Sequence, residues 1–507
     1  MAWLGERHSQ RRMCRMKPER HIHLIGICGT AMASLAGMLH RRGVRVTGSD
    51  TAAYPPMSEL LAQLGIPVLQ PFREENLDPR PDLVVIGNAI SRGNAEVEYC
   101  LDRRIRFTSL AQLLHDEFLF GHEVLCVAGT HGKTTTTSML AWILEVAGKS
   151  PSFLIGGIAE NFGSSFAVHD QSRHFIIEGD EYDTAFFDKG PKFLHYFPDA
   201  MILTSVEFDH ADIYRDLDAV KTAFKRLVNL IPRRGRIIAL DGATAGSPHV
   251  DDCVSRALCP VERYGLSEGA DWRVANVRYG PQRTRWEVHA GNKKFGDFEF
   301  PLAGQYNVLN ATAAAALASH YQIDPATIAK ALAGFRSVKR RLEVKAEIAG
   351  ITLIDDFAHH PTAIAETLKA LRARYAGRRL WAICEPRSNT LRRAVFQHEL
   401  GRSLALADAV VLASIFKPEA IAEHERLKTA AVIEQARAAG REAWELLDAD
   451  AIVREIAPKL RPGDVVAILS NGGFGGIYEK LPQRLREMYG GKLDAEAGLT
   501  PSGVAKR

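Results

Sequence analysis

Short apolar runs alternate along the chain with stretches whose apolar residues recur at helical spacing. The first run, "HIHLI" (21–25), leads into a glycine turn and a helical stretch that ends near Gly43. Further runs follow at 44–50 ("VRVTGSD"), 82–88 ("DLVVIGN") and 105–110 ("IRFTSL"). Strands that alternate with helices are typical of a parallel sheet with helices packed on it. The pattern therefore predicts an α/β unit at the start of the chain.

The same alternation returns twice. A second block opens with the strand in "EVLCVAGTHGK" (123–133) and closes with the helix in "NVLNATAAAALASHYQI" (307–323), while residues 260–303 alternate in a more β-like way. A third block starts near Ser337, where strands such as "RRLWAICEP" (378–386) are separated by Ala- and Leu-rich helices. We therefore predict three α/β units in tandem, which suits 507 residues at roughly 150 per domain. The expected boundaries are a disordered basic tail (1–20), three domains (21–120, 121–336 and 337–490) and a second disordered tail (491–507).

Composition excludes several classes of protein. An apolar content of 46% with 24% charged residues is typical of a globular protein, and no apolar run reaches the ~20 residues of a membrane span. Residues 1–20 account for the net charge of +4, so the remainder does not resemble a nucleic-acid-binding protein. The seven cysteines form no CxxC pair, which favours the reducing cytoplasm.

The stretch "VAGTHGKTTTTSML" (127–140) carries the most specific chemistry. Backbone N–H groups in a turn before a helix bind anions, a lysine adds positive charge for phosphates, and a threonine hydroxyl can ligate Mg²⁺. Gly129 and Gly132 are separated by two residues, whereas the ordinary phosphate loop has four between its glycines. The alternative is a glycine-rich turn with a surface lysine at position 133. A strand before the turn and a helix after it favour a nucleotide site.

Two acidic clusters each follow a predicted strand. They are "EGDEYD" (178–183) and "EFDHAD" (207–212). Ligands bind at the carboxyl ends of parallel strands, and Mg²⁺ needs few protein ligands beside phosphate oxygens. Each cluster by itself is also compatible with a solvated acidic loop. Their shared position after strands favours a magnesium site.

Taken together, these motifs resemble the ATP-dependent Mur ligases of bacterial cell-wall assembly. "GTHGKTTT" is similar to the shortened phosphate loop of that family, and the resemblance continues through "NVLNATAAAA", "RRLE" and "DDFAHHPTAI", over roughly residues 21 to 480. The family implies a Rossmann-like N-terminal domain that binds a UDP-sugar, a central P-loop ATPase domain, and a Rossmann-like C-terminal domain that receives an amino acid or peptide. It also implies ATP and Mg²⁺ as cofactors, and closure of the domains around them.

The resemblance assigns roles to individual residues. Catalysis is expected of Lys133, His210, Arg341 and His359, with His359 orienting the acceptor; the His359–His360 pair could equally cap a helix at Pro361. Thr134 and Glu178 are expected to ligate one Mg²⁺, and Glu178 and His210 a second. Asn310 is expected to read adenine, Arg341 to face the γ-phosphate and Asp356 to lie on the ribose side. The full expected ATP-binding set is Gly129, Thr130, His131, Gly132, Lys133, Thr134, Thr135, Asn310, Arg341 and Asp356.

The first glycine turn, "GICGTAM" (26–32), is a weak dinucleotide fingerprint, because Cys28 replaces the middle glycine. NAD(P) binding is the alternative that the bare pattern leaves open. In the family the same turn takes the diphosphate of a UDP-sugar. The residues expected to bind the sugar nucleotide are Gly26, Cys28, Gly29, Thr30, Ser49, Asp50, Asn88 and Asn94.

Three positions depart from the family pattern or raise a question about it. Tyr306 stands where histidine is usual and Ser205 where asparagine is common. Some members carbamylate a lysine about fifteen residues after the metal histidine. Lys225 lies at that distance from His210, and we interpret it as a surface helix residue.

The acceptor is the remaining question. One branch of the family adds L-alanine to UDP-N-acetylmuramate, and a sister branch adds the tripeptide L-alanyl-γ-D-glutamyl-meso-diaminopimelate during peptidoglycan recycling. The segment "EPRSNTLRR" (385–393) resembles the second branch, and Arg387 and Asn389 are expected to bind carboxylates of the peptide. Arg392 and Arg393 are either further ligands or solvated helix charges. A P-loop ATPase without ligase activity stays open as an alternative. We expect a monomer or weak homo-oligomer, with neither nucleic acid nor membrane as a partner.

Overall fold

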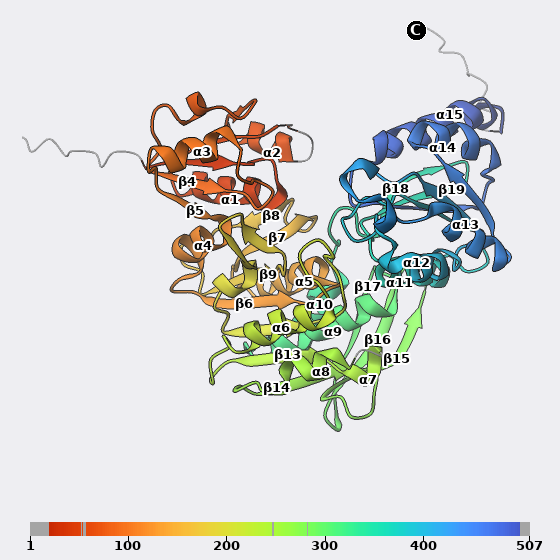
Figure 1. Cartoon of the computed structure of the whole chain (residues 1–507). Coiled ribbons are helices and arrows are strands. Elements are labelled where there is room, and N and C mark those ends of the chain that lie inside the picture. Colours follow the sequence, from red (N-terminus) through yellow and green to blue (C-terminus); the bar gives the residue numbers. More distant parts are fainter. Residues whose placement is uncertain (1–19, 52, 54–56, 246–247, 281, 497–507) are drawn as a thin grey trace, which may run out of the picture. The chain divides into compact units, whose positions relative to one another are not determined.

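A computed structural model of the chain describes residues 20–51, 53, 57–245, 248–280 and 282–496 (Figure 1). Two compact units make up the molecule: one comprises residues up to Glu117 together with Thr184–Lys189, and the other comprises the rest. Of the two tails predicted from the sequence, residues 1–19 and 497–507 lie outside the described part. Helix α15 (Ile477–Glu496) extends into the second predicted tail.

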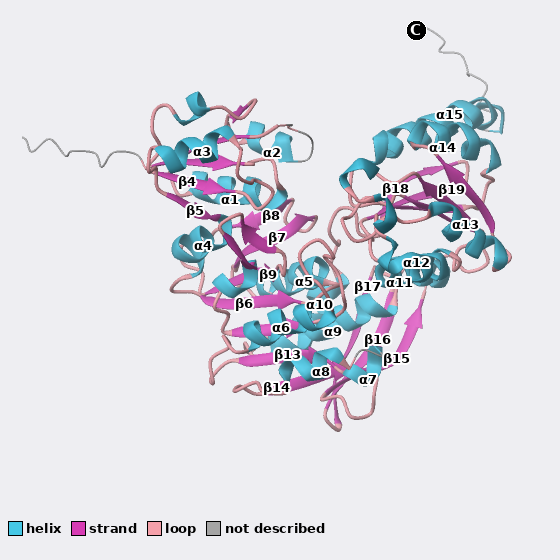
Figure 2. Ribbon diagram, in the orientation of Figure 1, coloured by secondary structure: helices cyan, strands magenta, loops and turns pink. Residues whose placement is uncertain are grey.

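The first unit contains a five-stranded parallel sheet, drawn in magenta in Figure 2. Its order, β3-β2-β1-β4-β5, is doubly wound, so the winding reverses between β1 and β4 and leaves a ligand crevice at the carboxyl ends of those strands. Its elements are β1 (His21–Ile25), α1 (Thr30–Arg41), β2 (Arg45–Ser49), α2 (Met57–Gln63), β3 (Val68–Leu69), β4 (Leu83–Ile86), α3 (Ala95–Asp102), β5 (Phe107–Ser109) and α4 (Leu110–Leu114).

The second unit begins with a ten-stranded sheet. The strands in the middle of this sheet are parallel, and antiparallel pairs lie at both ends. The range 260–303, with its more β-like pattern, contains four strands at one end, and the last three of them form antiparallel pairs. The sheet order is β17-β16-β15-β14-β13-β12-β6-β9-β7-β8. The strands are β6 (Glu123–Ala128), β7 (Ser152–Ala159), β8 (Ser164–Ala167), β9 (His174–Gly179), β12 (Ala200–Leu203), β13 (Arg236–Leu240), β14 (Val261–Gly265), β15 (Trp272–Tyr279), β16 (Thr284–Ala290) and β17 (Lys293–Phe300). A separate pair, β10 (Asp183–Ala185) and β11 (Asp188–Pro191), includes residues of the segment Thr184–Lys189 that belongs to the first unit.

Six helices accompany this sheet: α5 (Lys133–Val146), α6 (Leu217–Val228), α7 (Gly242–Ala245), α8 (His249–Val254), α9 (Gln305–Ser319) and α10 (Pro325–Ala333). Helix α9 packs against α5, and its run of buried alanines lets the two backbones approach closely. Helix α10 starts where its sequence predicts, because Asp324 accepts hydrogen bonds from the first turn and Pro325 suits the first helical position. Helices α5, α9 and α10 share one apolar core with strands of the sheet, including β6, which leads into the phosphate loop.

Glu262 in β14 ties together four elements at one part of the central sheet. Its carboxylate pairs with Arg236 of β13, accepts a 2.7 Å hydrogen bond from Nε1 of Trp272 in β15, and lies 3.0 Å from Nε2 of His320 at the end of α9. Burial acts to raise the pKa of Glu262, but these hydrogen bonds and positive charges outweigh it and lower the pKa to about 2. The carboxylate is therefore a structural anion of the folded state.

The third block forms a six-stranded sheet of order β18-β19-β23-β20-β21-β22, parallel except for the β18–β19 pair. Apolar cores cover both of its faces. The strands are β18 (Glu343–Ile348), β19 (Ile351–Asp356), β20 (Leu380–Cys384), β21 (Ala409–Ala413), β22 (Glu442–Leu446) and β23 (Val465–Leu469). The helices are α11 (Pro361–Arg374), α12 (Gln397–Leu404), α13 (Thr429–Ala438), α14 (Ala449–Ile456) and α15.

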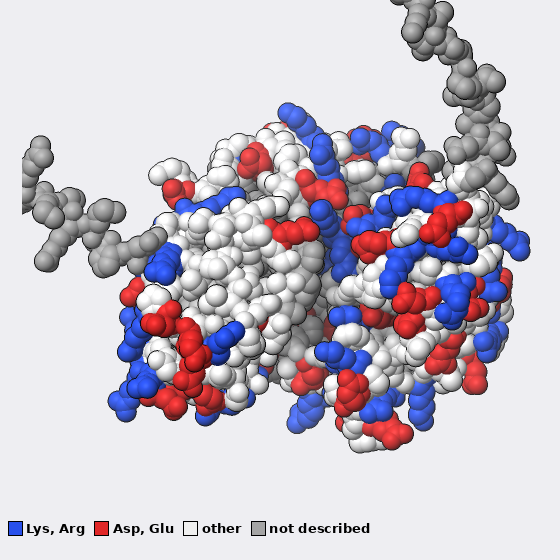
Figure 3. Space-filling view, turned by 90° about the horizontal axis from the view of Figure 1, so that it is seen from above, with Lys and Arg blue, Asp and Glu red and all other residues white. Residues whose placement is uncertain are grey.

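The surface carries charges of both signs. On the face drawn in Figure 3, Lys and Arg side chains are interspersed with Asp and Glu. Among the described residues, no helix combines the length and apolar character that crossing a membrane would require.

Candidate active site

The phosphate loop joins β6 to α5, as the sequence predicts. Gly129 has φ +131°, and a Cβ there would lie 2.2 Å from Oγ1 of Thr204, so the loop has no space for a side chain. Gly132 adopts the left-handed conformation at the N-terminus of α5. Ser205, which stands in the place of the usual asparagine, accepts a 3.0 Å hydrogen bond from the backbone N–H of His131. The loop is therefore held in the form that presents a helix N-terminus to an anion.

Lys133 lies within this loop and is largely buried. Its Nζ donates to the carbonyl oxygens of Gly129 (2.7 Å) and Thr130 (3.2 Å), and lies 2.9 Å from a carboxylate oxygen of Glu181. Burial acts to lower the pKa of Lys133, but the charges of Glu181 and Glu178 raise it above its usual value. Lys133 is thus a cation fixed beside the place where the loop would hold phosphates.

The three expected metal ligands form two separate contacts near Lys133. Oγ1 of Thr134 donates to Glu178 over 2.9 Å, so those two are together as predicted. His210 instead contacts Glu181, with 3.1 Å between Nε2 and Oε1. Burial acts to lower the pKa of His210, but the hydrogen bond and charge of Glu181 raise it to about 9. Sequence reasoning overlooked Glu181 as a functional residue, although it stands inside the acidic cluster 178–183.

A cavity of about 580 Å³ opens beside the loop and joins the central and third blocks. Asn310 of α9 faces it, and its Oδ1 would lie 2.7 Å from a Cβ on Gly132, while its Nδ2 is buried without a hydrogen-bond partner. Arg341 and Asp356 of the third block also line the cavity. The predicted nucleotide residues that line it are His131, Gly132, Thr134, Thr135, Asn310, Arg341 and Asp356.

Asp356 is present at this cavity but its oxygens are already engaged. The carboxylate accepts hydrogen bonds from the backbone N–H groups of Leu342 (2.8 Å) and Ala358 (2.9 Å), and from Oγ1 of Thr367 (3.1 Å). Burial raises the pKa of Asp356, although the positive charge of Arg341 acts against that rise. Asp356 therefore holds the segment that contains Arg341 and Leu342 beside the cavity. Tyr306, which replaces the usual histidine, lines the same cavity.

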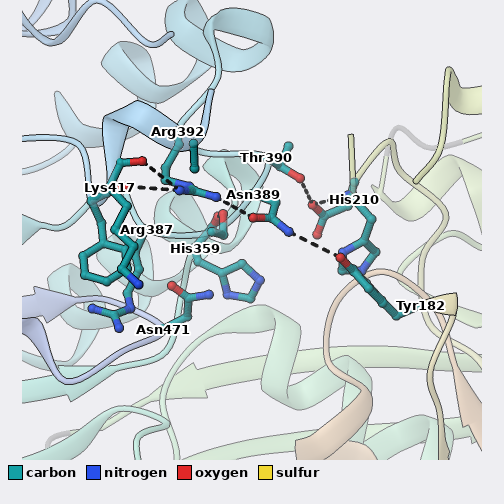
Figure 4. A pocket seen from close by; sticks show the side chains of 13 residues that line it. Tyr182, His210, His359, Arg387, Asn389, Thr390, Arg392, Lys417 and Asn471 are labelled. Carbon is teal, nitrogen blue, oxygen red and sulfur yellow. Dashed lines mark hydrogen bonds between the residues drawn. The ribbon is translucent and has the colours of Figure 1, made fainter. Parts of the chain in front are cut away.

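A second cavity, of about 500 Å³, lies between the segment 387–392 and the loop 209–210 (Figure 4). The guanidinium of Arg387 stacks over the ring of Phe416 with 3.8 Å to its centroid. His359 lines the cavity with its Nδ1 bound to the carbonyl of Phe357, and burial lowers the pKa of His359 below its usual value. Lys417 and Asn471 line the same cavity and were not expected from the sequence. These side chains offer cationic and amide donors for anionic groups.

Arg392 and Arg393 do not lie in a helix, because residues 389–392 form turns and Arg393 forms a β-bridge with Arg426. Arg392 donates to the carbonyl oxygens of Phe416 (3.1 Å) and Lys417 (3.3 Å) and to Oδ1 of Asn389 (2.6 Å). Arg393 pairs with Glu425 and is absent from the lining of the cavity. Of the two, only Arg392 shapes the second cavity, which we call the acceptor cavity.

Asn389 and Thr390 connect the acceptor cavity to the acidic loop 207–212. Nδ2 of Asn389 donates to Asp212 over 2.7 Å and lies 3.3 Å from the hydroxyl of Tyr182, as Figure 4 shows for the second contact. Thr390 donates to Asp209 over 2.7 Å and accepts from the backbone N–H of Ala211 over 3.3 Å. The acceptor segment is thereby held against the loop that carries His210.

His360, next to His359, caps helix α11. Its Nδ1 accepts from the backbone N–H of Thr362 over 3.3 Å, and its Nε2 donates to the carbonyl of Phe208 over 3.2 Å. Burial lowers the pKa of His360 to about 4. His360 therefore caps the helix, whereas His359 lines the acceptor cavity.

The expected sugar-nucleotide residues of the first unit lie at or after the carboxyl ends of β1, β2 and β4. Gly26 has φ +83°, Gly29 and Thr30 are exposed, and Asp50 accepts a 2.9 Å hydrogen bond from the backbone N–H of Cys28. Burial raises the pKa of the Cys28 thiol to about 11. Asn88 follows β4 and is half-buried.

Two of the expected sugar-nucleotide residues, Ser49 and Asn94, have structural contacts within the first unit. Ser49 is fully buried and donates to Glu96 over 2.5 Å. Asn94 accepts hydrogen bonds from the backbone N–H groups of Glu96 and Val97 and so caps helix α3. Glu96, which the sequence did not single out, also accepts a 2.6 Å hydrogen bond from Nδ2 of Asn76. Ser49 therefore has no exposed atom with which to touch a ligand.

Three family models match the chain one after another. Residues 21–118 match the Mur ligase family catalytic domain, residues 127–318 the Mur ligase middle domain, and residues 340–472 the Mur ligase glutamate ligase domain. The chain belongs to the Mur ligase family, whose members are ATP-dependent ligases that form amide bonds. The α/β fold class and the family predicted from the sequence are therefore confirmed.

Individual relatives cover nearly the whole chain. It is 42% identical over 464 residues to the UDP-N-acetylmuramate–L-alanyl-γ-D-glutamyl-meso-2,6-diaminoheptandioate ligase of Escherichia coli (strain K12), over 91% of this chain and 97% of that protein. It is 32% identical over 467 residues to the UDP-N-acetylmuramate–L-alanine ligase of Geobacter sp. (strain M21), over 92% of this chain and 97% of that protein. The crystal structure of a murein peptide ligase from Psychrobacter arcticus 273-4 matches with a TM-score of 0.70 and 37% identity, over 92% of this chain and 98% of that one.

Proposed function

We propose that this protein joins the lactyl carboxylate of UDP-N-acetylmuramate to the L-alanyl amine of L-alanyl-γ-D-glutamyl-meso-diaminopimelate, in peptidoglycan recycling. ATP supplies the free energy and leaves as ADP and phosphate. The proposal rests on the family, on the 42% identity to a ligase named for this reaction, and on the acceptor cavity.

The acceptor cavity is the observation that carries the choice of substrate. Free L-alanine offers one carboxylate and a methyl group, which need little space. The tripeptide brings several carboxylates and a distal amine. A cavity of about 500 Å³ lined by Arg387, Arg392, Lys417, Asn389 and Asn471 has the volume and the donors that such a peptide requires.

The chemistry proceeds in two steps. A carboxylate oxygen of the muramate attacks the γ-phosphorus of ATP and forms an acyl phosphate, and the bond to the β-phosphate oxygen breaks to release ADP. The neutral amine of the peptide then attacks the acyl carbon, and inorganic phosphate leaves as the amide forms and the nitrogen loses a proton. Both steps bring negative oxygens together, so catalysis depends on positioning and on charge neutralisation.

In this scheme the residues of the nucleotide cavity divide the work. Residues 129–135 would hold the phosphates, with Lys133 compensating charge on the β- and γ-phosphates and Arg341 on the γ-phosphate. Asn310 would bind adenine through its unpartnered Nδ2. Asp356 would lie on the ribose side and would position the segment that carries Arg341, through its hydrogen bond with Leu342.

A magnesium ion fits part of the expected site. Thr134 and Glu178 lie together and offer the oxygen ligands that Mg²⁺ prefers. His210, expected to hold a second Mg²⁺ with Glu178, would do so only after exchanging its contact with Glu181 and losing a proton, since the pKa of His210 is raised to about 9. When bound, Mg²⁺ would neutralise charge on the transferred phosphoryl group.

The remaining residues belong to the two other substrates. The turn at 26–30, Asp50 and Asn88 would bind the UDP-sugar, with Ser49 and Asn94 supporting that turn. His359, neutral because burial lowers the pKa of its ring, would orient the peptide amine. We place the reaction in the cytoplasm, where cysteines stay reduced; the cysteines among the described residues are free and buried. We propose that the chain is a monomer or weak homo-oligomer.

The deciding experiment offers UDP-N-acetylmuramate and ATP with L-alanine, di-, tri- and tetrapeptide side by side, and identifies the products by mass spectrometry. We expect the tripeptide product to dominate, with ADP released in equal amount. A dominant L-alanine product would assign the protein to the biosynthetic alanine ligases instead. ADP release that does not depend on either acceptor or sugar would support an ATPase.

A further inference from the structure

Three potential metal ligands from distant parts of the chain meet beside the phosphate loop. His131 belongs to the loop itself, Glu207 follows β12, and His360 caps α11. One ligand atom from each lies within 4.8 Å of the other two. This group, the His131–Glu207–His360 triad, contains none of the residues expected to hold Mg²⁺.

The hydrogen bonds around the triad fix the tautomer of His360. A carbonyl oxygen can only accept, so the 3.2 Å contact with Phe208 places the proton of His360 on Nε2. Nδ1 of His360 therefore presents a lone pair, which lies 3.9 Å from Oε2 of Glu207. Its single donor there is the N–H of Thr362, at a long 3.3 Å.

His131 is the third member of the triad and also lies close to Glu207. Its Nε2 is buried, has no hydrogen-bond partner within the described residues, and lies 3.4 Å from Oε2 of Glu207. The two imidazole rings are 4.7 Å apart between centroids. Buried polar atoms are normally paired, so an unpartnered nitrogen beside a carboxylate is a candidate ligand atom for a cation.

From this geometry we propose that the His131–Glu207–His360 triad is a binding site for a divalent transition-metal ion, with Zn²⁺ as the best match. Two imidazoles and one carboxylate are a zinc donor set with an open fourth position, whereas Mg²⁺ prefers oxygen. Bond lengths of about 2.0–2.2 Å place tetrahedral ligand atoms roughly 3.3–3.5 Å apart. The 3.4 Å and 3.9 Å separations are near that value, and small side-chain rotations close the rest.

The triad connects the phosphate loop to the third block. His131 and Glu207 line the nucleotide cavity, and His360 begins a helix of the third block. An ion bound to all three ties the phosphate loop to helix α11. The ion would therefore restrain the phosphate loop relative to α11, at a site separate from the metal positions expected for the ligase reaction.

The test is a titration of the full-length, nucleotide-free protein with Zn²⁺ in the presence of saturating Mg²⁺, measured by competition with a chromogenic chelator. Co²⁺ in place of Zn²⁺ reports tetrahedral geometry through its visible absorption. We expect one ion per chain. His360→Asn keeps an oxygen for the helix cap but removes the imidazole, and Glu207→Gln keeps an acceptor for the hydroxyl of Thr362, which lies 2.6 Å away.

Each of these two variants is expected to weaken Zn²⁺ binding by about ten-fold or more. Two controls match them. His289→Gln alters a histidine that lies 3.5 Å from a single glutamate, and His210→Asn alters the expected magnesium site, so both are expected to keep the wild-type affinity. Thermal unfolding confirms that each variant is folded. Absence of a stoichiometric site, undiminished affinity in both triad variants, or loss of the ion in His210→Asn would overturn the assignment, whatever the outcome of the ligase assays.

Discussion

Arg387 gives the sharpest test of the proposed acceptor, through the substitution Arg387→Lys. Its guanidinium lies 3.8 Å above the centroid of Phe416 and 3.4 Å from a carboxylate oxygen of Glu385. It also packs on Gly472, where a Cβ would lie 2.0 Å from Nε of the arginine. This flat slot fixes the plane of the guanidinium, which can then bind a peptide carboxylate through two parallel hydrogen bonds. Lysine keeps the charge but loses the plane and the second hydrogen bond.

The size of the effect follows from the lost contacts. One hydrogen bond to a charged group contributes about 1.5–3 kcal/mol. Since about 1.4 kcal/mol corresponds to ten-fold in an equilibrium or rate ratio, we expect kcat/KM for the tripeptide to fall roughly ten- to hundred-fold. The value for free L-alanine is expected to change little, because alanine lacks the carboxylates that reach this side chain.

The assay compares kcat/KM for tripeptide and for L-alanine by coupled ADP release, with UDP-N-acetylmuramate and MgATP saturating. Arg393→Lys is the matched control, because Arg393 pairs with Glu425 and does not line the cavity. An equal loss with both acceptors, or the same loss in the Arg393 control, would refute the role given to Arg387.

Three further predictions test other parts of the structure. Lys133→Ala is expected to lower turnover by roughly 100-fold or more while calorimetry finds UDP-sugar binding intact, because Lys133 lies outside the unit that carries the sugar turn; loss of sugar binding would contradict the domain assignment. Thr390→Val breaks the 2.7 Å contact with Asp209, so we expect kcat/KM to fall for both acceptors alike, unlike Arg387→Lys; a tripeptide-selective loss would argue against a positioning role. Glu262→Gln is expected to lower the free energy of unfolding by about 1–3 kcal/mol at pH 7. The pKa of Glu262 is about 2 in the folded chain and lies below the unfolded value of about 4.3, so its contribution is complete above the unfolded pKa and is lost as pH falls towards 2. Denaturant titrations are therefore expected to show the difference from wild type shrinking to about half near pH 3, and a difference independent of pH would contradict the assignment.

Local patterns in the sequence were enough to predict much of the architecture. The alternation of apolar runs with helical stretches depends on neighbours in the chain, and so do the glycines of the phosphate loop. Gly129 shows why such signals are readable, because its φ of +131° and the closeness of Thr204 exclude a side chain. The more β-like pattern at 260–303 likewise marked the strands β15, β16 and β17 before their pairing was known.

What the sequence could not decide was which of several similar side chains meet. The cluster 178–183 contains two glutamates, and the arrangement of β9 and its loop assigns Glu178 to Thr134 and Glu181 to Lys133 and His210. The family resemblance placed Ser49 among the sugar-nucleotide ligands, yet the packing of α3 buries it against Glu96.

The roles of adjacent residues also depended on the fold. His359 and His360 are neighbours in sequence, but the start of α11 turns one towards the acceptor cavity and the other towards Phe208. The meeting of His360 with Glu207 and His131 has no trace in local sequence, because the three belong to separate segments of the chain. Periodicity and turn chemistry act over a few residues, so the sequence by itself determined the elements and the phosphate loop. Packing between distant segments sets the distances between side chains, so only the tertiary structure decided the partners on which the chemistry depends.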